Sequence, residues 1–283
     1  MSNSVILGLV QMSMVKEPQK NLSKALSNIK KAAKKGAQIV CLSELFTTLY
    51  FPQKEKSDVF NLAEKIPGTT SGALSTAAKE NDVILIGGSI FEKDGNKFYN
   101  TSMVFDENGK MLGKYRKIHI PYDTGFYEQK YFQQGNLGYK VFDTKYCKIG
   151  AMICYDQWYP EAARINSLMG ADIVFYPTAI GTMQGVKQTE GSWQEAWENV
   201  QRGHAIANGV MVSAVNRVGR EGNTTFWGGS FVIDQFGKTL VRGSDKDEIL
   251  IVKCNLELGK EVKEGWRFFY NRRPNTYKKV LEM

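Results

Sequence analysis

The fold class is decided by the stretch IGAMICYD, residues 149–156 of this 283-residue chain. Its apolar part ends in Cys154 and is typical of a strand that is buried on both faces. Pro160 suits the first position of a helix that ends at Gly170, and residues 173–176 form a second apolar run. Strand, helix and strand in this order predict an α/β fold with at least one large sheet covered by helices.

The same alternation continues in both directions from this stretch. Apolar runs predict strands, and amphipathic spacing predicts helices. The further predicted strands are residues 5–10, 37–42, 83–90, 101–105, 111–115, 210–215, 230–233, 239–241 and 248–254, and the further helices are residues 21–35, 70–80 and 192–208. No repeat, low-complexity segment or Pro/Ser-rich linker interrupts the chain, so we expect a single domain over residues 1–283.

Composition and charge describe an ordinary globular protein. Lys and Arg total 37 against 29 Asp and Glu, a net charge of +8. The densest basic run, residues 30–35, closes a predicted helix, where cations suit the helix dipole, so a nucleic-acid surface is the weaker interpretation. The four cysteines are too widely spread for a disulfide framework, and the sequence predicts neither a signal peptide nor a membrane span. We expect a cytoplasmic protein that binds neither nucleic acid nor membrane.

Several common kinds of active site find no support in the motifs. The only histidines are His119 and His204, so a His-based metal site or a Ser-His-Asp triad would have to use one of them. The motifs G-x-x-x-x-G-K-[ST], G-x-G-x-x-G and G-x-S-x-G are absent. We therefore expect chemistry that needs no cofactor and no metal.

Three reactive side chains follow the ends of predicted buried strands. Glu44 comes after residues 37–42, Lys117 after residues 111–115, and Cys154 closes residues 149–154. Sites in helix-covered sheets collect at the carboxyl ends of strands, because loops there present side chains on a rigid scaffold. Taken singly, a thiol in this position is more often a core residue, the glutamate an ion-pair partner and the lysine a surface cation. The combination indicates one shared site.

The same segments carry a family resemblance. LSELF at 42–46, YRKIHIP at 115–121 and MICYDQWYPEAAR at 152–164 resemble the nitrilase (carbon–nitrogen hydrolase) superfamily in content and order, and the similarity runs from residue 5 to about residue 274. The resemblance implies a four-layer α-β-β-α sandwich. It also implies a homo-oligomer whose subunits pair through helices and a C-terminal tail, for which the segment from about residue 260, including RRP at 272–274, is the candidate.

The resemblance implies Cys154 as nucleophile, Glu44 as general base and Lys117 as electrostatic stabiliser, with Glu128 as a second carboxylate beside them. The chemistry of these residue types agrees. A thiolate splits the hydrolysis of an unreactive amide or ureido carbon into two easier steps. A carboxylate can take the thiol proton, and a nearby ammonium favours the anion. Lys117 and the backbone N–H of Tyr155 are the expected donors to the tetrahedral oxyanion.

Within the superfamily the chain is most similar to the N-carbamoylputrescine amidohydrolase branch. The similarity lies in DQWYPE at 156–161, in ELF at 44–46 followed by YF at 50–51, and in GFYEQKYF at 125–132. A substrate of this branch ends in an ammonium group, which needs a carboxylate or an aromatic cage. The expected substrate-binding residues are Tyr50, Asp123, Tyr155, Trp158, Thr178, Ala179, Glu190 and Glu195.

Other substrates stay open, since residues 122–124 and 181–191 depart from the commoner pattern. A β-ureidopropionase-like or ω-amidase-like enzyme would act on substrates that end in carboxylate and would need a cation in the pocket. The remote alternative, suggested by the net charge of +8, is a non-enzymatic protein that binds nucleic acid or a protein partner.

Polar residues near the nucleophile are expected to serve the scaffold. Asp156 and Arg164 are candidates for a mutual ion pair, and His119 for orienting the lysine loop. His204 lies on an apolar helical stripe, which favours a hydrogen-bonded core or interface residue over a catalytic one.

Overall fold

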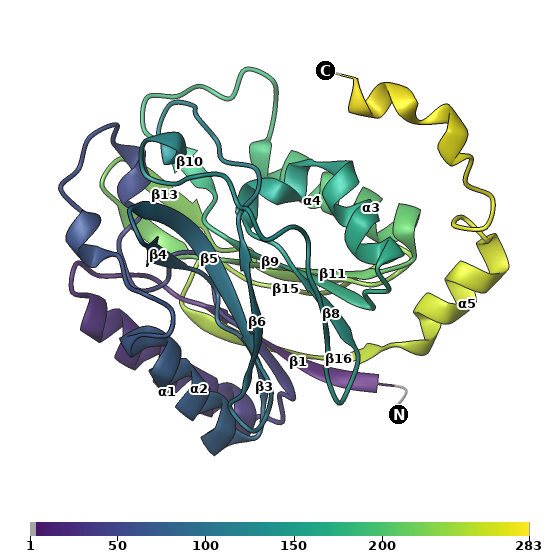
Figure 1. Ribbon diagram of the computed structural model, residues 1–283, viewed down its shortest axis with the longest axis horizontal. Helices are drawn as coiled ribbons and strands as arrows, with labels where there is room; N and C mark the ends of the chain where they lie inside the picture. The colour runs from purple at the N-terminus through teal and green to yellow at the C-terminus, as the bar shows by residue number, and fades with distance from the viewer. Residues whose placement is uncertain (1–3, 283) are drawn as a thin grey trace.

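The structure is a computed structural model that describes residues 4–282. Two large β-sheets stack face to face, and helices cover the outer face of each (Figure 1). Helices α1 (Pro18–Lys34) and α2 (Thr69–Asn81) lie on one side, and α3 (Pro160–Leu168) and α4 (Trp193–Asn208) lie on the other. The layers are therefore α-β-β-α, which confirms the predicted sandwich.

Each large sheet combines parallel central strands with antiparallel edges. The first has the order β16-β1-β2-β3-β5-β4, with β6 paired to β5, and the second has the order β15-β14-β11-β9-β8-β7. The strands of the first are β1 (Ser4–Gln11), β2 (Ile39–Cys41), β3 (Ile84–Ile86), β4 (Ile90–Asp94), β5 (Lys97–Phe105), β6 (Met111–Arg116) and β16 (Glu248–Asn255). Those of the second are β7 (Val141–Asp143), β8 (Lys148–Ala151), β9 (Ile173–Thr178), β11 (Met211–Asn216), β14 (Phe231–Ile233) and β15 (Thr239–Arg242). A third, small sheet joins β10 (Gly181–Met183), β13 (Thr224–Trp227) and β12 (Val218–Glu221).

Alternation along the strands builds a separate apolar core between each pair of layers. In β9, Ile173 and Phe175 enter the core between the two sheets. Val174 and Tyr176 enter the core beneath α3 and α4, where they join Trp197. Successive side chains of a strand point to opposite faces, so an uninterrupted apolar run supplies both cores at once.

Strand direction brings the carboxyl ends of several strands to one edge of each sheet. β1, β2 and β3 are parallel, and β6 runs in the same direction because β5 is antiparallel to both β3 and β6. In the second sheet β8, β9 and β11 are parallel. Glu44 follows β2, Lys117 follows β6 and Cys154 follows β8, so the topology gives each of the three the position from which it can reach the others.

The strand predicted over residues 83–90 is wrong in its extent. The structure divides it into β3 and β4, with Gly87, Gly88 and Ser89 between them. Gly88 has φ +57°, and a Cβ there would lie 2.1 Å from the carbonyl oxygen of Ser43. The chain bends here because its backbone passes directly against the segment that carries Glu44.

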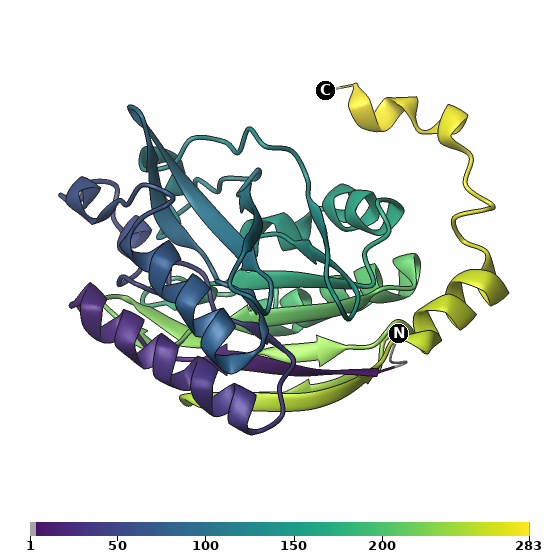
Figure 2. The ribbon, with the colours of Figure 1, turned by 60° about the horizontal axis from the view of Figure 1, so that its bottom comes forward.

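The C-terminal part contains a helix that is absent from the predicted elements, which end with the strand at residues 248–254. A fifth helix, α5 (Glu257–Trp266), follows β16, and only Gly259 and Val262 of it are buried. Figure 2 shows the yellow segment after α5 running outside both sheets, on the side of α3 and α4. Within the described residues, no helix has both the length and the apolar character needed to cross a membrane.

Candidate active site

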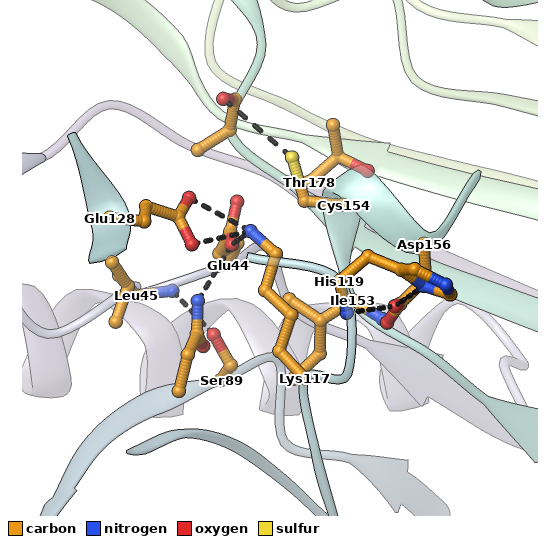
Figure 3. Close-up of polar contacts among 12 residues, drawn as sticks. Glu44, Leu45, Ser89, Lys117, His119, Glu128, Ile153, Cys154, Asp156 and Thr178 are labelled. Atoms are coloured by element: carbon orange, nitrogen blue, oxygen red, sulfur yellow. Dashed lines mark hydrogen bonds and ion pairs between the residues drawn. The ribbon is translucent and has the colours of Figure 1, made fainter. Parts of the chain in front are cut away.

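A buried lysine lies at the centre of the site. Lys117 Nζ is 2.8 Å from Glu44 Oε1, and it is 2.8 and 2.7 Å from the two carboxylate oxygens of Glu128. The three side chains are fully buried. Figure 3 shows the ends of Glu44 and Glu128 meeting the end of the Lys117 side chain, with Cys154 beside them. The site is thus one ammonium group between two carboxylates, next to a thiol.

Glu44 is anchored through only one of its carboxylate oxygens. Oε1 accepts hydrogen bonds from Lys117 Nζ and from Asn100 Nδ2, each at 2.8 Å. Oε2 is buried and has no hydrogen-bond partner among residues 4–282. The next residue, Leu45, has φ 46°, and its N–H donates to Ser89 Oγ at 2.9 Å. The segment thus fixes the direction of the side chain and leaves one oxygen free to take a proton.

Cys154 lies at a sharp turn after β8. It begins the 3₁₀-helix Cys154–Trp158 and has φ 41°, a left-handed conformation that is costly for a residue with a Cβ. Its Sγ is 3.9 Å from the carbonyl oxygen of Ala179, and 7% of the residue is exposed. Asp156 caps the turn by accepting the N–H of Ile153 at 3.0 Å. The turn holds the thiol at the strand end instead of directing it into the core.

Burial opposes ionisation of the Cys154 thiol. Burial raises the pKa of the Cys154 thiol well above its usual range, Glu44 raises it further and Lys117 opposes both. The nearby ammonium thus favours the anion, as expected, but burial and the charge of Glu44 outweigh its effect. A nucleophilic role for Cys154 therefore requires proton transfer to a base.

The neighbouring charges keep Lys117 cationic. Burial alone lowers the pKa of its amine, but the charges of Glu128 and Glu44 outweigh burial, and the pKa is raised. Burial also raises the pKa of Glu128 to about 7, against the opposing effect of Lys117 and with a further rise from Glu44. The site thus combines a permanent ammonium with a carboxyl group that gains or loses its proton near neutral pH.

Comparisons with known proteins identify the family. The model of the carbon–nitrogen hydrolase family matches residues 6–264. The chain belongs to the carbon–nitrogen hydrolase family. It is 39% identical over 290 residues to an N-carbamoylputrescine amidase of Solanum lycopersicum, covering 99% of this chain and 95% of that protein. It is 38% identical over 283 residues to a citrullinase of Francisella tularensis subsp. tularensis, covering 98% of both.

A solved structure gives the same assignment. The crystal structure of a carbon–nitrogen hydrolase from Helicobacter pylori G27 matches with a TM-score of 0.94 and 40% identity, covering 98% of both chains. Together with the family match, these relatives make this carbon–nitrogen hydrolase an amidohydrolase enzyme.

Three of the expected substrate-binding residues lie close to the central cluster of this carbon–nitrogen hydrolase. The hydroxyl of Tyr50 donates to Glu128 Oε1 at 2.8 Å. The carbonyl oxygen of Ala179 lies 3.9 Å from the Sγ atom of Cys154. Thr178, the residue before it, is buried and lies near Cys154 in Figure 3, with its hydroxyl 2.8 Å from the carbonyl oxygen of Tyr176.

Two others are on the nucleophile turn itself. Tyr155 and Trp158 belong to the 3₁₀-helix that Cys154 begins, and both are half-buried. The ring of Tyr155 meets that of Tyr159 edge-on, with centroids 5.6 Å apart. Tyr159 in turn stacks on His119 at 3.6 Å, so aromatic packing connects the nucleophile turn to the loop after Lys117.

The three expected acidic residues are not part of the buried cluster. Asp123, Glu190 and Glu195 are all exposed. Asp123 accepts the N–H of Thr124 at 2.6 Å, and Glu190 accepts the indole N–H of Trp193 at 3.4 Å. Glu195 lies in the first turn of α4. They are surface carboxylates, and Asp123 connects to the site only through its loop, in which the ring of Phe126 packs 5.9 Å from that of Tyr50.

The suggested ion pair between Asp156 and Arg164 is wrong. Asp156 accepts hydrogen bonds from Tyr115 and from both the N–H and Nδ1 of His119. The Arg164 guanidinium lies over the ring of Phe269, 5.3 Å from its centroid. Asp156 points to the loop after Lys117 while α3 carries Arg164 toward the C-terminal segment, so the two side chains point to different neighbours.

Several buried polar residues around the site are not among the predicted site residues. Asn100 holds the base, and Arg217 with Glu221 contacts the segment that follows it. Their only signal in the sequence is a polar residue inside or at the end of an apolar strand, which is a weak one. His204 is a hydrogen-bonded core residue, as predicted, with its Nε2 2.9 Å from the carbonyl oxygen of Gln157.

Proposed function

We propose that this enzyme hydrolyses N-carbamoylputrescine to putrescine, carbon dioxide and ammonia through a covalent intermediate on Cys154. The observation that carries the chemistry is the buried Lys117 ammonium, 2.8 Å from Glu44 and 2.7 Å from Glu128, beside the thiol of Cys154 (Figure 3). The choice of substrate is supported by the 39% identity to a plant N-carbamoylputrescine amidase over 99% of this chain.

In the first step, Glu44 Oε2 takes the thiol proton while Sγ of Cys154 attacks the ureido carbon. The π electrons of the carbonyl move to its oxygen, and Lys117 Nζ and the backbone N–H of Tyr155 stabilise the resulting oxyanion. A donor of this kind typically contributes about 100- to 1,000-fold in rate. The unpaired Oε2 of Glu44 supports its assignment as the base.

In the second step, the oxyanion re-forms the carbonyl, the C–N bond breaks and the protonated Glu44 gives its proton to the leaving nitrogen, so that an S-carbamoyl group (a thiocarbamate) remains on Cys154. Water then attacks the thiocarbamate carbon, Glu44 takes its proton, and the C–S bond breaks as the sulfur regains a proton. The carbamic acid that forms loses its second nitrogen and releases carbon dioxide. One water molecule is consumed in each cycle.

The remaining predicted residues are proposed to hold the substrate and the cluster in place. Glu128 keeps Lys117 between two carboxylates, and Tyr50 holds Glu128. An extended substrate with its ureido group at the sulfur has its ammonium several methylene groups away, where a carboxylate or an aromatic face lowers the cost of burying it. The proposed pocket residues at and beyond the sulfur are Thr178, Ala179, Trp158, Asp123, Glu190 and Glu195.

Citrulline is the second candidate substrate, because a relative that is 38% identical is a citrullinase. It carries the same ureido group on a chain that ends in an α-amino acid instead of an amine. The test compares kcat/KM for N-carbamoylputrescine, citrulline and N-carbamoyl-β-alanine. We expect N-carbamoylputrescine to be preferred by at least about tenfold, the discrimination that about 1.4 kcal/mol provides. A higher value for either of the others refutes the substrate assignment and leaves the thiol chemistry standing.

The thiol chemistry is tested with Cys154→Ser and Cys154→Ala. Both variants should fold and turn over no ureido or amide substrate, and intact-protein mass spectrometry of the wild type with substrate should reveal an adduct that the variants lack. Cys147→Ser is the matched control, because this buried thiol lies in the core between the sheets. Retained turnover in Cys154→Ala rules out the covalent mechanism.

We further propose a homo-oligomer in which a second copy covers the outer side of α3 together with the C-terminal segment. Ile165, Leu168 and Met169 are 37%, 43% and 47% exposed, and Leu281 in the segment opposite is 87% exposed. A groove lies between these elements and is lined by both. Apolar side chains gathered in this way are typical of an interface. Leu168→Glu should lower the molar mass measured by light scattering, whereas Val15→Glu, at an exposed position in the loop before α1, should not.

The four cysteines are buried and unpaired. This fits the proposal that the enzyme works in the reducing cytoplasm.

A further inference from the structure

Arg217 is a fully buried arginine that the proposed chemistry does not use. It lies between β11 and β12, and its side chain is 0% exposed. Its Nε and Nη2 lie 2.9 and 2.6 Å from Oε1 of Glu221, which is also buried. Charged side chains are almost never fully buried unless they are paired and hydrogen-bonded, because desolvation is costly. The pair therefore needs a reason to lie inside the molecule.

Among residues 4–282, the remaining side-chain hydrogen bonds of the pair all reach the segment that carries the base. Arg217 Nη2 donates to the carbonyl oxygen of Thr48 at 2.8 Å, and Nη1 lies 3.4 Å from the carbonyl oxygen of Glu44. Glu221 Oε2 accepts the N–H of Tyr50 at 2.6 Å. This segment is irregular, since Leu45 has φ 46°. The ion pair supplies hydrogen-bond partners to three of its backbone groups, the carbonyl oxygens of Glu44 and Thr48 and the N–H of Tyr50.

The backbone of Arg217 belongs to the other half of the site. Its N–H donates to the carbonyl oxygen of Thr178 at 3.3 Å. The following residue, Ala179, is the one whose carbonyl oxygen lies at Cys154 Sγ. One residue thus contacts the segment after β2 in the first sheet and the end of β9 in the second.

We propose that Arg217 and Glu221 are positioning residues that fix the distance between the base Glu44 and the nucleophile Cys154. The proposal rests on the function proposed above and deepens it. Neither residue contacts the reacting atoms. They act through the backbone of the base segment, which they join to the strand end beside the thiol.

The planar guanidinium is the chemical requirement. A single guanidinium donates at once to Glu221 and to two carbonyl oxygens, because its N–H groups point in fixed, divergent directions. A lysine ammonium keeps the positive charge for Glu221 but does not reach the same set of acceptors. Arg217→Lys therefore separates the geometric role from the charge, without leaving an unpaired buried carboxylate.

The experiment compares Arg217→Lys and Glu221→Gln with the wild type by steady-state kinetics on the preferred ureido substrate and by the rate of Cys154 alkylation with iodoacetamide. A misplacement of about 1 Å costs on the order of 100-fold in rate. We expect Arg217→Lys to lower kcat by about 10- to 100-fold with KM within about threefold, and the alkylation rate to fall in parallel. Glu221→Gln should lower both rates less, since one of its two oxygens stays an acceptor.

The matched control is Arg242→Lys. Arg242 binds Glu198 with the same geometry, Nε at 2.9 Å and Nη2 at 2.6 Å, but its side chain is 46% exposed. This variant should keep wild-type kinetics.

Alkylation distinguishes positioning from a merely structural role. A loosened fold exposes the thiol and raises the alkylation rate, whereas a displaced base lowers it. Wild-type kcat in Arg217→Lys, or a lower kcat with faster alkylation, overturns the positioning proposal alone. A wild type that hydrolyses no ureido or amide substrate overturns the proposed function, and the proposal that rests on it.

Discussion

Asp156→Asn tests whether one carboxylate holds the loop after Lys117 against the nucleophile turn. Asp156 is fully buried. Its Oδ1 accepts the N–H of His119 at 3.0 Å and lies 2.7 Å from His119 Nδ1. Its Oδ2 accepts the Tyr115 hydroxyl at 2.8 Å and the N–H of Ile153 at 3.0 Å. The substitution turns one of these acceptors into a donor and keeps the shape.

The cost follows from counting donors in each orientation of the new amide. With its NH₂ toward Tyr115, the hydroxyl can rotate and accept, but the N–H of Ile153 loses its acceptor. With its NH₂ toward His119, the imidazole can change tautomer, but the backbone N–H of His119 loses its acceptor. Either way one backbone N–H is left without a partner, which costs about 1–3 kcal/mol. We expect the free energy of unfolding to fall by about 2 kcal/mol.

The assays are urea denaturation and steady-state kinetics on the wild type, Asp156→Asn and Tyr115→Phe. Because the orphaned N–H lies at the nucleophile turn or in the lysine loop, kcat for Asp156→Asn should fall by about 10- to 100-fold. Tyr115→Phe, which removes one hydroxyl, should cost about 1 kcal/mol of stability and keep kcat within about threefold. An Asp156→Asn variant within about 0.5 kcal/mol of the wild type, at full kcat, refutes the reasoning.

Three further predictions concern Glu128 and Lys117 in the buried cluster and Gly125 in the loop that packs against Tyr50. Folding raises the pKa of Glu128 from 4.5 to about 7, so the folded state binds this proton more tightly than the unfolded state does. The stability that the protonated group contributes is therefore lost as pH rises through 7. In urea titrations, the free energy of unfolding of the wild type, relative to that of Glu128→Gln, should fall by about 3 kcal/mol between pH 4 and pH 8. Lys117→Arg should lower kcat/KM by at least about 100-fold, because a planar fork does not fit the fully buried space of a compact ammonium; near-wild-type kinetics would contradict this. A Cβ at Gly125, where φ is +77°, would lie 1.6 Å from Met183 Sδ, and the next residue, Phe126, packs against Tyr50. Gly125→Ala should therefore lower kcat/KM, and Met183→Ala should partly restore it in the double variant; an unchanged kcat/KM in Gly125→Ala would contradict this.

The buried strands of the fold were predictable because they depend on local pattern. An apolar run such as that of β9 needs cover on both faces, which local pattern predicts, but the pattern does not say whether a helix or a second sheet covers each face; the four-layer order was implied by the family resemblance. The break between β3 and β4 was not predictable in the same way. Gly88 is glycine because the backbone of Ser43 passes close to it, and no local pattern records a contact across more than forty residues of chain. α5 was missed although Leu258, Val262 and Trp266 recur at a spacing of four, because the segment is short and contains two glycines, Gly259 and Gly265, which disfavour a helix.

The residues of the site also fall into those that local sequence predicts and those that it does not. Residues that end strands, such as Cys154 and Lys117, could be singled out because strand ends are where chemistry collects. Asn100 and Arg217 could not, since each matters only through the backbone or side chain of a distant residue. The raised pKa of the Cys154 thiol also depends on the whole fold, because burial and the charge of Glu44 outweigh the lowering effect of Lys117.

The arrangement of charges explains why such a polar cluster can work while buried. Moving the thiol proton to Glu44 transfers one negative charge from a carboxylate to sulfur, and attack then passes it to the substrate oxygen. In the proposed mechanism the net charge of the cavity stays constant throughout, so no step pays a new desolvation cost. Lys117 contacts Oε1 of Glu44 and not Oε2, so protonation of Oε2 weakens its hold on the base and frees its positive charge for the oxyanion. The Lys117 ammonium can therefore stabilise the negative charge on Glu44, then on sulfur and then on the substrate oxygen. A surface cation farther away than about 8 Å cannot do this, because salt screens its charge.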